Sequence, residues 1–355
     1  MISTATLAQA GKQQGAALLR FLAILILALL VFAIVLLVFG KNPIEAYVDI
    51  FTSTIGSSYG WSEVLVKVIP LVLCATAVLL PARIGLVNVG GEGQLYIGAL
   101  VASWGALAVA DVMPGFLGLP TIIILGFIGG GLWAAIPAVL RAMGWLNETI
   151  STLLLNYVAF NFLLYLLYGP WKDPKSAFPH SEQYEAFERL PLVGWENITW
   201  ALPIALILAV AIWWLLNVSR FGFYARFVDA NPKMAAAVGV PIVMLTLSSA
   251  LLSGAISGVG GFVVSAGIEG RMTQSFFLGY TFSGILIAFL ARSNALIAIL
   301  VAVFVGVLFV AGQSLQVFYQ IPGSMVQLIQ AIIVISVAAS EFFVRHRVHW
   351  VRGAG

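Results

Sequence analysis

Apolar runs long enough to cross a membrane recur along the whole chain. Residues 21–39 form a run of 19 without a charged side chain, and about 20 apolar residues span the hydrocarbon core as a helix. Similar runs follow at about 64–82, 86–110, 120–141, 148–168, 199–217, 241–265, 274–291, 295–312 and 323–344. The chain is 61% hydrophobic and 9% charged, whereas soluble domains carry about 25% charged residues. The sequence therefore predicts an all-α polytopic membrane protein with about ten transmembrane helices, and it excludes a disordered chain, a nucleic-acid-binding protein and a disulfide scaffold.

The basic residues predict the orientation of these spans. Ten spans place both termini on one side of the membrane. With the N-terminus inside, the inner loops and ends hold eleven Lys and Arg residues and the outer segments hold five, which follows the positive-inside rule. Both termini are therefore expected in the cytoplasm. Residues 1–355 are interpreted as a single transmembrane domain with two long connections, an outer loop at about 169–198 and a cytoplasmic segment at about 219–240.

Polar residues and glycines interrupt one apolar run near its start. Residues 85–94 (GLVNVGGEGQ) contain four glycines together with Asn88, Glu92 and Gln94. Glycine costs a helix about 1 kcal/mol relative to alanine, and irregular backbone at membrane depth is tolerated only where protein or a water-filled cavity covers it. We expect a discontinuous helix whose polar side chains line a solute path. The alternative is a tightly packed helix start in which Glu92 bonds neighbouring backbone amides.

A second set of polar residues follows the start of another span. Glu148, Thr152 and Asn156 are four residues apart, so they share one face of a helix, and the stripe reaches about 12 Å into the membrane. Such a stripe lines a pore or holds two helices together. We favour the pore and add Thr152 and Asn156 to the candidate pathway residues. Asn161 falls off this face and is expected to serve helix packing.

Two pairs of glycines have the spacing of close helix contacts. They are Gly126 with Gly130 and Gly254 with Gly258. Because small residues four apart lie on one face, they let a second helix backbone approach closely. Both pairs are therefore interpreted as packing sites.

The cytoplasmic segment 219–240 predicts a short helix. Asn231 is a suitable N-cap, Pro232 favours the first helical turn, and the helix-forming run KMAAAV follows at 233–238. So short a helix is not stable alone in water, so it must pack against the bundle or a partner. Basic and aromatic side chains are typical of protein–protein interfaces, so we interpret this segment as a docking site for a partner. The alternative is that its basic residues only anchor the segment at the membrane surface under the positive-inside rule. The candidate docking residues are Arg220, Arg226, Asp229, Asn231, Pro232 and Ala236.

Sequence motifs of enzymes are missing. No G-x-x-x-x-G-K-[ST] phosphate loop, H-E-x-x-H, G-x-S-x-G or paired-cysteine metal motif occurs. We therefore expect that the chain is not an enzyme and holds no metal or cofactor. If ATP drives transport, a separate ATPase uses the ATP and Mg.

Four segments together resemble one known family. They are residues 85–94; 147–157 (NETISTLLLNY); 220–223 (RFGF) with 229–240 (DANPKMAAAVGV); and 279–284 (GYTFSG) with 291–295 (ARSNA). In this order they resemble the signatures of bacterial ABC-importer permeases for nucleosides and simple sugars, the branched-chain amino acid/ribose-type family. The departures are Ser283 for a common aspartate, Ala291 and Ala295 for a glycine and a proline, and Asp229 for a glycine or glutamate.

The resemblance implies a ten-helix, multi-pass permease subunit in the cytoplasmic (inner) membrane of a prokaryote, surrounded by membrane lipid. It implies an identical or sister permease subunit, two ATP-hydrolysing subunits on the cytoplasmic side and an extracytoplasmic solute-binding protein. The long outer loop and the N-E-x-I-x-T element are most similar to nucleoside-type permeases. The resemblance thus implies an importer of nucleosides or a related sugar-like solute, with segment 219–240 docking the ATPase.

Other functions remain as alternatives. A simple sugar or a branched-chain amino acid is a possible solute, although an amino acid brings two charges and the chain offers mainly amides and aromatic rings. A self-sufficient secondary transporter needs ionisable residues deep in both halves, and only the first half has one, Glu92. No nucleophile–base or metal-ligand constellation in the sequence supports a membrane enzyme.

Overall fold

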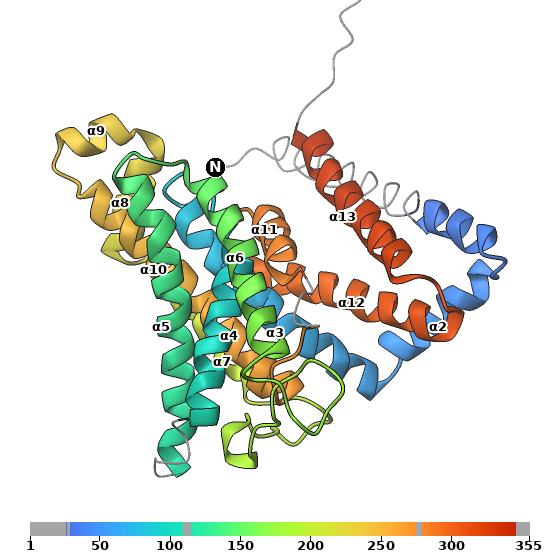
Figure 1. The fold of residues 1–355 in the computed structure, drawn as a ribbon. Coiled ribbons are helices and arrows are strands. Elements are labelled where there is room, and N and C mark those ends of the chain that lie inside the picture. The colour runs from blue at the N-terminus through green and yellow to red at the C-terminus, as the bar shows by residue number, and fades with distance from the viewer. Residues whose placement is uncertain (1–25, 27–28, 109–114, 275–278, 346–355) are drawn as a thin grey trace, which may run out of the picture. The chain divides into compact units, whose positions relative to one another are not determined.

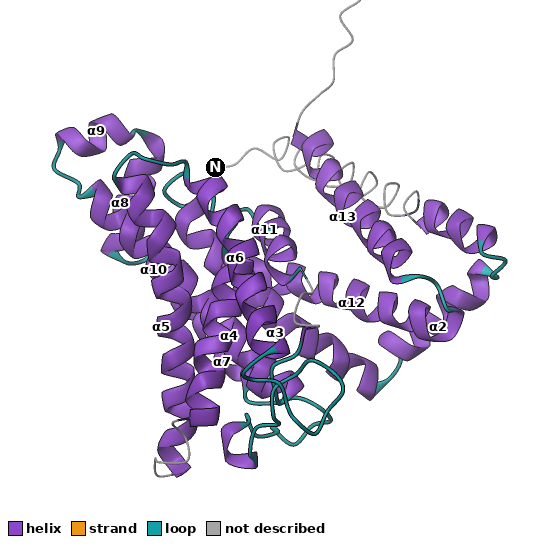
Figure 2. Cartoon of the chain, in the orientation of Figure 1, coloured by secondary structure: helices purple, strands orange, loops and turns teal. Residues whose placement is uncertain are grey.

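The structure, a computed structural model, describes residues 26, 29–108, 115–274 and 279–345. Within these ranges the chain forms helices and the loops that join them, with two isolated β-bridges and no strand (Figure 2). The prediction of an all-helical chain is thereby confirmed.

A helix over Leu29–Val38 precedes the labelled elements. The elements then follow in chain order as α2 (Pro43–Thr54), α3 (Ser58–Ala82), α4 (Gly91–Ala108), α5 (Gly115–Ala142), α6 (Glu148–Tyr168), the 3₁₀ turn η2 (Ala186–Glu188), α7 (Ala201–Asn217), α8 (Arg220–Ala230), α9 (Pro232–Ala237), α10 (Ile242–Phe262), the π segment η3 (Val263–Glu269), α11 (Tyr280–Leu290), α12 (Ala295–Tyr319) and α13 (Gly323–Arg345) (Figure 1).

Each predicted span from 64–82 onward overlaps a helix, but the span predicted at 274–291 is helical only over the 11 residues of α11, which is shorter than a membrane crossing. Five helical segments of the described chain are long and apolar enough to cross a membrane: α3, α5, α6, α12 and α10 together with η3. Two bent pairs, Leu29–Val38 with α2 and α7 with α8, would raise that number to seven. Residues 21–25, 27 and 28 of the first predicted span, 21–39, lie outside the described residues, and most of the remainder forms the helix Leu29–Val38. The total of ten spans and the side on which the termini lie stay predictions.

The chain divides into two compact units. One comprises residues 1–60 and 307–355, and the other comprises residues 61–306. In the first, α2 packs against the end of α12, where the Tyr319 hydroxyl donates to Asp49 Oδ2 at 2.5 Å. Gln330 of α13 donates to the Leu308 carbonyl at 3.0 Å. The second unit contains all candidate site residues.

Glycines bring three helices of the second unit, α4, α5 and α10, into backbone contact. A Cβ added at Gly258 would lie 2.2 Å from the Gly126 carbonyl oxygen, and one at Gly254 would lie 2.4 Å from that of Gly130. A Cβ at Gly98 of α4 would lie 2.2 Å from the Gly258 Cα. The two predicted glycine pairs are therefore packing sites, as expected, and they pack against each other.

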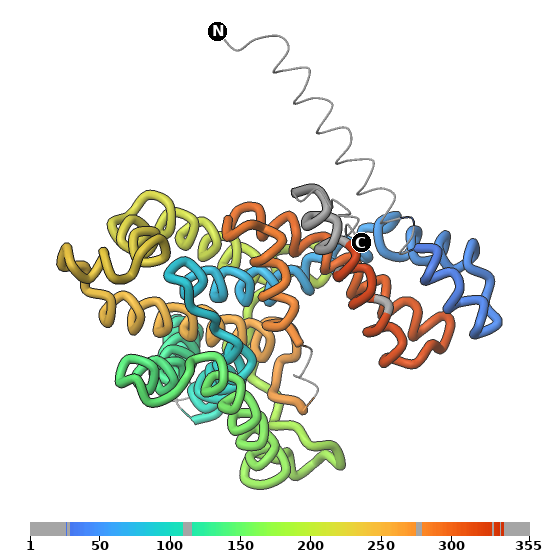
Figure 3. Tube along the Cα trace, turned by 90° about the horizontal axis from the view of Figure 1, so that it is seen from above, coloured from blue at the N-terminus to red at the C-terminus, as the bar shows by residue number. Residues whose placement is uncertain are grey.

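The two long connections lie at opposite ends of this unit (Figure 1). The α8–α9 hairpin is at one end, and it also lies at the margin of the unit when the molecule is viewed from above (Figure 3). At the other end, segment 169–198 is fixed to the chain around η3, because Ser181 N–H donates to the Met272 carbonyl and Leu190 N–H to that of Ala266. The ring of Tyr184 is buried and shares a hydrogen bond with Ser103 of α4, and this burial raises the pKa of the Tyr184 phenol.

Candidate functional site

The predicted break in the glycine-rich span lies between α3 and α4. Residues 83–90 are irregular and α4 begins at Gly91, five residues after the predicted start at 86. Gly85 has a φ of +75°, a conformation that side chains other than glycine rarely adopt. A Cβ at Gly91 would lie 2.4 Å from Thr281 Cγ2, so only a glycine lets the break approach α11 so closely.

Asn88 and Gln94 form a reciprocal amide pair across this break. Asn88 Nδ2 donates to Gln94 Oε1 at 2.9 Å, and Gln94 Nε2 donates to Asn88 Oδ1 at 3.2 Å. Asn88 Nδ2 also donates to Ser253 Oγ of α10 at 2.9 Å. Both amide side chains are buried, and buried polar groups of this kind are retained when they are fully hydrogen-bonded. The pair therefore ties the irregular segment to both α4 and α10.

The sequence analysis did not include Ser253 in the site. A signal was present, because Ser249, Ser253 and Ser257 are spaced four residues apart within an apolar run. This is the pattern from which the polar face of 148–156 was identified. All three serines are buried.

Asn156 fastens α6 to the same break. Its Oδ1 accepts the Gly93 backbone N–H at 2.8 Å, and its Nδ2 donates to the Val89 carbonyl at 2.9 Å. The N–H groups of a first helical turn have no partner within their own helix, so Asn156 satisfies one of them. Thr152, one turn earlier on α6, is also buried and packs against Gly90.

Glu92 lies in the first turn of α4 and is buried. Its Oε1 accepts the backbone N–H of Thr281 at 2.8 Å, at the beginning of α11. A carboxylate is favourable at the N-terminus of a helix because of the exposed N–H groups and the helix dipole. The alternative stated in the sequence analysis was that Glu92 bonds a backbone amide near a helix start. This geometry agrees with that alternative, except that the amide belongs to α11 and not to a neighbouring residue.

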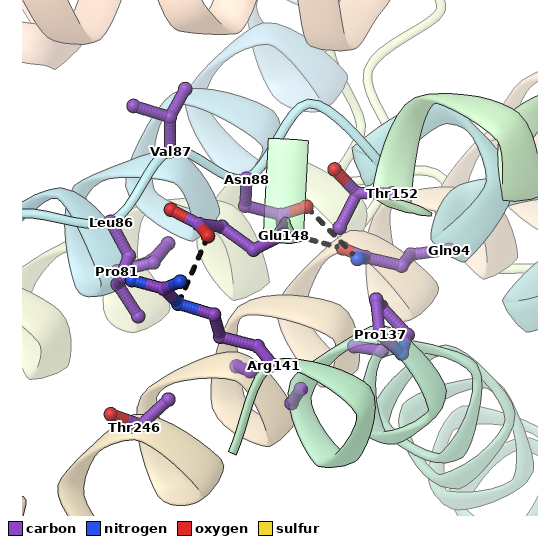
Figure 4. Close-up of a pocket in the computed structure, with 13 residues that line it drawn as sticks. Pro81, Leu86, Val87, Asn88, Gln94, Pro137, Arg141, Glu148, Thr152 and Thr246 are labelled. Atoms are coloured by element: carbon purple, nitrogen blue, oxygen red, sulfur yellow. Dashed lines mark hydrogen bonds and ion pairs between the residues drawn. The ribbon is translucent and has the colours of Figure 1, made fainter. Parts of the chain in front are cut away.

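Three of the candidate residues, Asn88, Gln94 and Thr152, line a small pocket together with Arg141 and Glu148 (Figure 4). Arg141 Nε and Glu148 Oε2 are 3.1 Å apart and form an ion pair between the end of α5 and the start of α6. The other two candidates, Glu92 and Asn156, do not line the pocket.

The volume of the pocket is about 30 Å³. A cavity needs about 10–15 Å³ of such volume to hold one water molecule, whereas small-molecule sites have roughly 300–1,000 Å³. The pocket is therefore too small for a solute in this conformation, and it is partly open, with a wall that is mainly apolar apart from the amide, hydroxyl and charged side chains named above.

The cytoplasmic segment forms a helical hairpin. Asn231 Oδ1 accepts the Met234 N–H at 3.0 Å and α9 begins at Pro232, which confirms the predicted cap and helix start. A second helix, α8, precedes it and was not predicted. On the buried face of the hairpin, Ala225 of α8 and Ala235 of α9 belong to one apolar cluster with Ile84, which directly precedes Gly85, so the hairpin packs near the segment that leads to Asn88.

The other face of the hairpin is open. The six candidate docking residues are all exposed: Arg220, Arg226, Asp229, Asn231, Pro232 and Ala236. Apolar side chains that the sequence analysis did not select are exposed beside them, namely Phe223, Met234 and Val238. The hairpin thus presents a mixed basic and apolar surface.

The break, the amide pair and the hairpin belong to a membrane permease. Residues 60–338 match the family described as the permease component of the branched-chain amino acid transport system. The chain belongs to this family: it is a multi-pass ABC-transporter permease of the cytoplasmic membrane, and the resemblance of its four motifs is confirmed.

Several named permeases are similar over most of their length. A glucose ABC transporter permease, TsgB13 of Haloferax volcanii, is 37% identical over 332 residues, which cover 90% of this chain and 87% of that protein. A guanosine ABC transporter permease, NupP of Bacillus subtilis, is 30% identical over 328 residues, covering 89% and 91%. A nucleoside ABC transporter permease, NupB of Lactococcus lactis, is 28% identical over 316 residues, covering 86% of each. No solved structure matches the chain.

Proposed function

We propose that this chain is the membrane permease of an ABC importer that carries nucleosides into the cytoplasm. The observation that carries the proposal is the amide pair of Asn88 and Gln94, which lines the small pocket between α4, α5, α6 and α10. Amide groups donate and accept hydrogen bonds without a net charge, which suits the hydroxyls and base edges of a neutral nucleoside.

The charges around the pocket disfavour an amino acid as the solute. Arg141 and Glu148 are the charged residues of the pocket, and they already pair with each other. A free amino acid would need a separate partner for its ammonium and for its carboxylate, because unpaired charges are costly at membrane depth. A neutral solute needs neither.

In this proposal Asn88, Gln94 and Thr152 contact the solute as it passes. Glu92 and Asn156 stand behind them: Glu92 holds the start of α11, and Asn156 holds the irregular segment from α6. All five residues therefore belong to the pathway region: Asn88, Gln94 and Thr152 line it, and Glu92 and Asn156 hold the lining segments in place. No residue of this chain carries out chemistry on the solute.

A simple sugar is the second candidate. It is favoured by the glucose permease TsgB13, which is 37% identical to this chain. Sugars and nucleosides share the hydroxyl groups that amides recognise, so the amide pair by itself suits both classes.

Transport in this proposal depends on other chains. An identical or sister permease completes the path, a solute-binding protein delivers the solute from outside, and ATP-hydrolysing subunits bind the exposed face of the α8–α9 hairpin. Those subunits use ATP and Mg, and this chain needs no cofactor. Because the hairpin shares an apolar cluster with Ile84, next to the turn that leads to Asn88, movement of the ATPase can reach the pocket.

Uptake by cells that contain the complete transporter tests the solute. Labelled guanosine and labelled glucose are offered to cells with and without this chain. We expect guanosine uptake only in cells that have the chain, and Asn88→Ala should reduce it. The control is Gln183→Ala, which removes an exposed amide of segment 169–198 and should leave uptake unchanged. If the chain is required for uptake of glucose but not of guanosine, the solute is a sugar and the nucleoside proposal is wrong.

A further inference from the structure

Three helices contribute residues to the pocket in two layers. Each helix supplies two pocket residues that are four positions apart: Pro137 and Arg141 on α5, Thr152 and Glu148 on α6, and Ala250 and Thr246 on α10. Four residues rise about 6 Å along a helix, so the two members of each set lie one turn apart. Because α5 ends and α6 and α10 begin at the end of the bundle that carries the α8–α9 hairpin (Figure 1), Arg141, Glu148 and Thr246 lie nearer to the hairpin. We call these three residues the inner layer.

An ion pair lies within the inner layer. Arg141 Nε and Glu148 Oε2 are 3.1 Å apart, and the two side chains are 46% and 17% exposed. In Figure 4 this contact lies beside Leu86, on the side of the pocket away from Gln94. The ion pair therefore stands between the amide pair of Asn88 and Gln94 and the end of the bundle that carries the hairpin.

The ion pair is not needed to hold α5 to α6, because the turn between these helices has its own caps. At the end of α5 the Trp145 N–H donates to the Leu140 carbonyl at 3.0 Å, and Gly144 has a φ of +72°, as in a Schellman motif. At the start of α6 the Asn147 Oδ1 accepts the Thr149 N–H at 2.9 Å. Both helix ends are thus capped without the two charged side chains.

Leu86 connects the pocket with the hairpin. It lines the pocket, and it also packs against the apolar cluster that contains Ala225 of α8 and Ala235 of α9. Leu245, the neighbour of Thr246 on α10, is a buried member of the same cluster. A shift of the hairpin therefore reaches the inner layer by two routes, through Leu86 of the irregular segment and through Leu245 of α10.

We propose that the ion pair of Arg141 and Glu148 is the inner gate of the solute path. This rests on the proposed function and names the residues that close the path on the side of the ATPase. With the pair formed, the pocket is too small for a nucleoside. When the hairpin shifts, the guanidinium and the carboxylate separate and water hydrates each of them, which costs little because exposed ion pairs are weak. The formed pair has no net charge, so it closes the path without presenting an unpaired charge to a neutral solute.

Thiol labelling of the complete transporter tests whether the ion pair shields the deeper part of the pocket. Thr152→Cys places a thiol one turn beyond Glu148, and the single cysteine of the chain, Cys74, is fully buried. A charged methanethiosulfonate reagent is added from the side of the ATPase, in inside-out vesicles. Reaction should be slow with the pair intact and several-fold faster when Arg141→Glu is added. Trp145→Cys in the exposed turn is the control and should react rapidly in both backgrounds. Equal rates for Thr152→Cys in the two backgrounds would overturn the proposal.

Leak of guanosine separates a gate from a structural contact. Liposomes that contain the complete transporter are loaded with labelled guanosine and kept without ATP. Arg141→Glu should release guanosine several-fold faster than the wild type at an unchanged unfolding temperature, because two facing carboxylates repel each other and hold the gate open. Exchange of the two charges, Arg141→Glu together with Glu148→Arg, should restore the slow release.

Stability and leak together decide between the two roles. A lower unfolding temperature of Arg141→Glu without faster release would show that the pair only holds α5 to α6, and the proposal would be wrong. Faster release that the exchanged charges do not reverse would also contradict it. If the unaltered transporter carries no guanosine, the proposed function fails, whereas the labelling rates still test the gate because they need no solute.

Discussion

Asn156 of α6 holds the first turn of α4, because its Oδ1 accepts the Gly93 N–H at 2.8 Å while its Nδ2 donates to the Val89 carbonyl at 2.9 Å. One side chain thus bridges the end of the irregular segment and the helix that follows it. The path region depends on this bridge, since Asn88 and Gln94 lie on the two elements that it joins.

Asn156→Ala should destabilise the folded permease. It leaves one buried backbone N–H and one carbonyl without their partner, each at a cost of about 1–3 kcal/mol. The thermal unfolding temperature of the purified complex should fall, and uptake should fall with it. Asn161→Ala is the control on the same helix, since the Asn161 amide bonds only its own helix. Equal unfolding temperatures for Asn156→Ala and the wild type would show that the bridge contributes little.

Glu92→Gln should retain most of the transport activity. A glutamine oxygen can still accept the Thr281 N–H at the start of α11, so the connection between α4 and α11 survives. Glu92→Ala removes it and should lower both stability and uptake. Loss of uptake in Glu92→Gln with unchanged stability would instead mean that transport needs the carboxylate, as in an ion-coupled carrier.

Gly258→Ala should be among the most damaging substitutions in the bundle. The added Cβ would lie 2.2 Å from the Gly126 carbonyl oxygen, and helix backbones at a close contact cannot yield as a flexible side chain does. Yield of folded protein from the membrane is the measurement. Gly118→Ala on α5 is the control, because its Cβ would meet only the Phe187 side chain at an ordinary 3.7 Å. Similar yields of the two variants would contradict the packing.

Two neighbouring alanines of the hairpin should behave differently. Ala236 is exposed, so Ala236→Trp should leave the fold intact but prevent the ATPase from docking or uncouple ATP hydrolysis from uptake. Ala235 is buried against the bundle, so Ala235→Trp should destabilise the hairpin itself. Arg226→Glu should act like Ala236→Trp. The measurements are copurification of the ATPase with the permease and the coupling of ATP hydrolysis to uptake. If the Ala236→Trp and Arg226→Glu variants retain the ATPase and normal coupling, the hairpin is only a membrane anchor.

The local features of the sequence were sufficient to predict much of the helical architecture. Predicted spans from 64–82 onward overlap helices, although only α11, 11 residues long, occupies 274–291, and the cap at Asn231 follows from an asparagine before a proline. Such features depend on a few neighbouring residues and on hydropathy. The glycine pairs were also recognised, although the sequence could not tell that Gly126 and Gly258 face each other.

The candidate site was predicted less completely, because its contacts join distant parts of the chain. Asn88 bonds Ser253 and Glu92 bonds Thr281, pairs separated by more than a hundred residues. A polar stripe in the sequence does not say whether a path or another helix lies opposite it. On α6 the buried part of the predicted stripe, Thr152 and Asn156, packs against the break before α4.

The central claim is that this chain is the permease of an ATP-driven nucleoside importer. Its most direct test is guanosine accumulation in liposomes that contain the purified permease, with and without its partner ATPase and solute-binding protein. The account predicts ATP-dependent accumulation with the partners, and neither ATP hydrolysis nor accumulation by the permease alone. Accumulation by the permease alone, driven by an ion gradient, would contradict it.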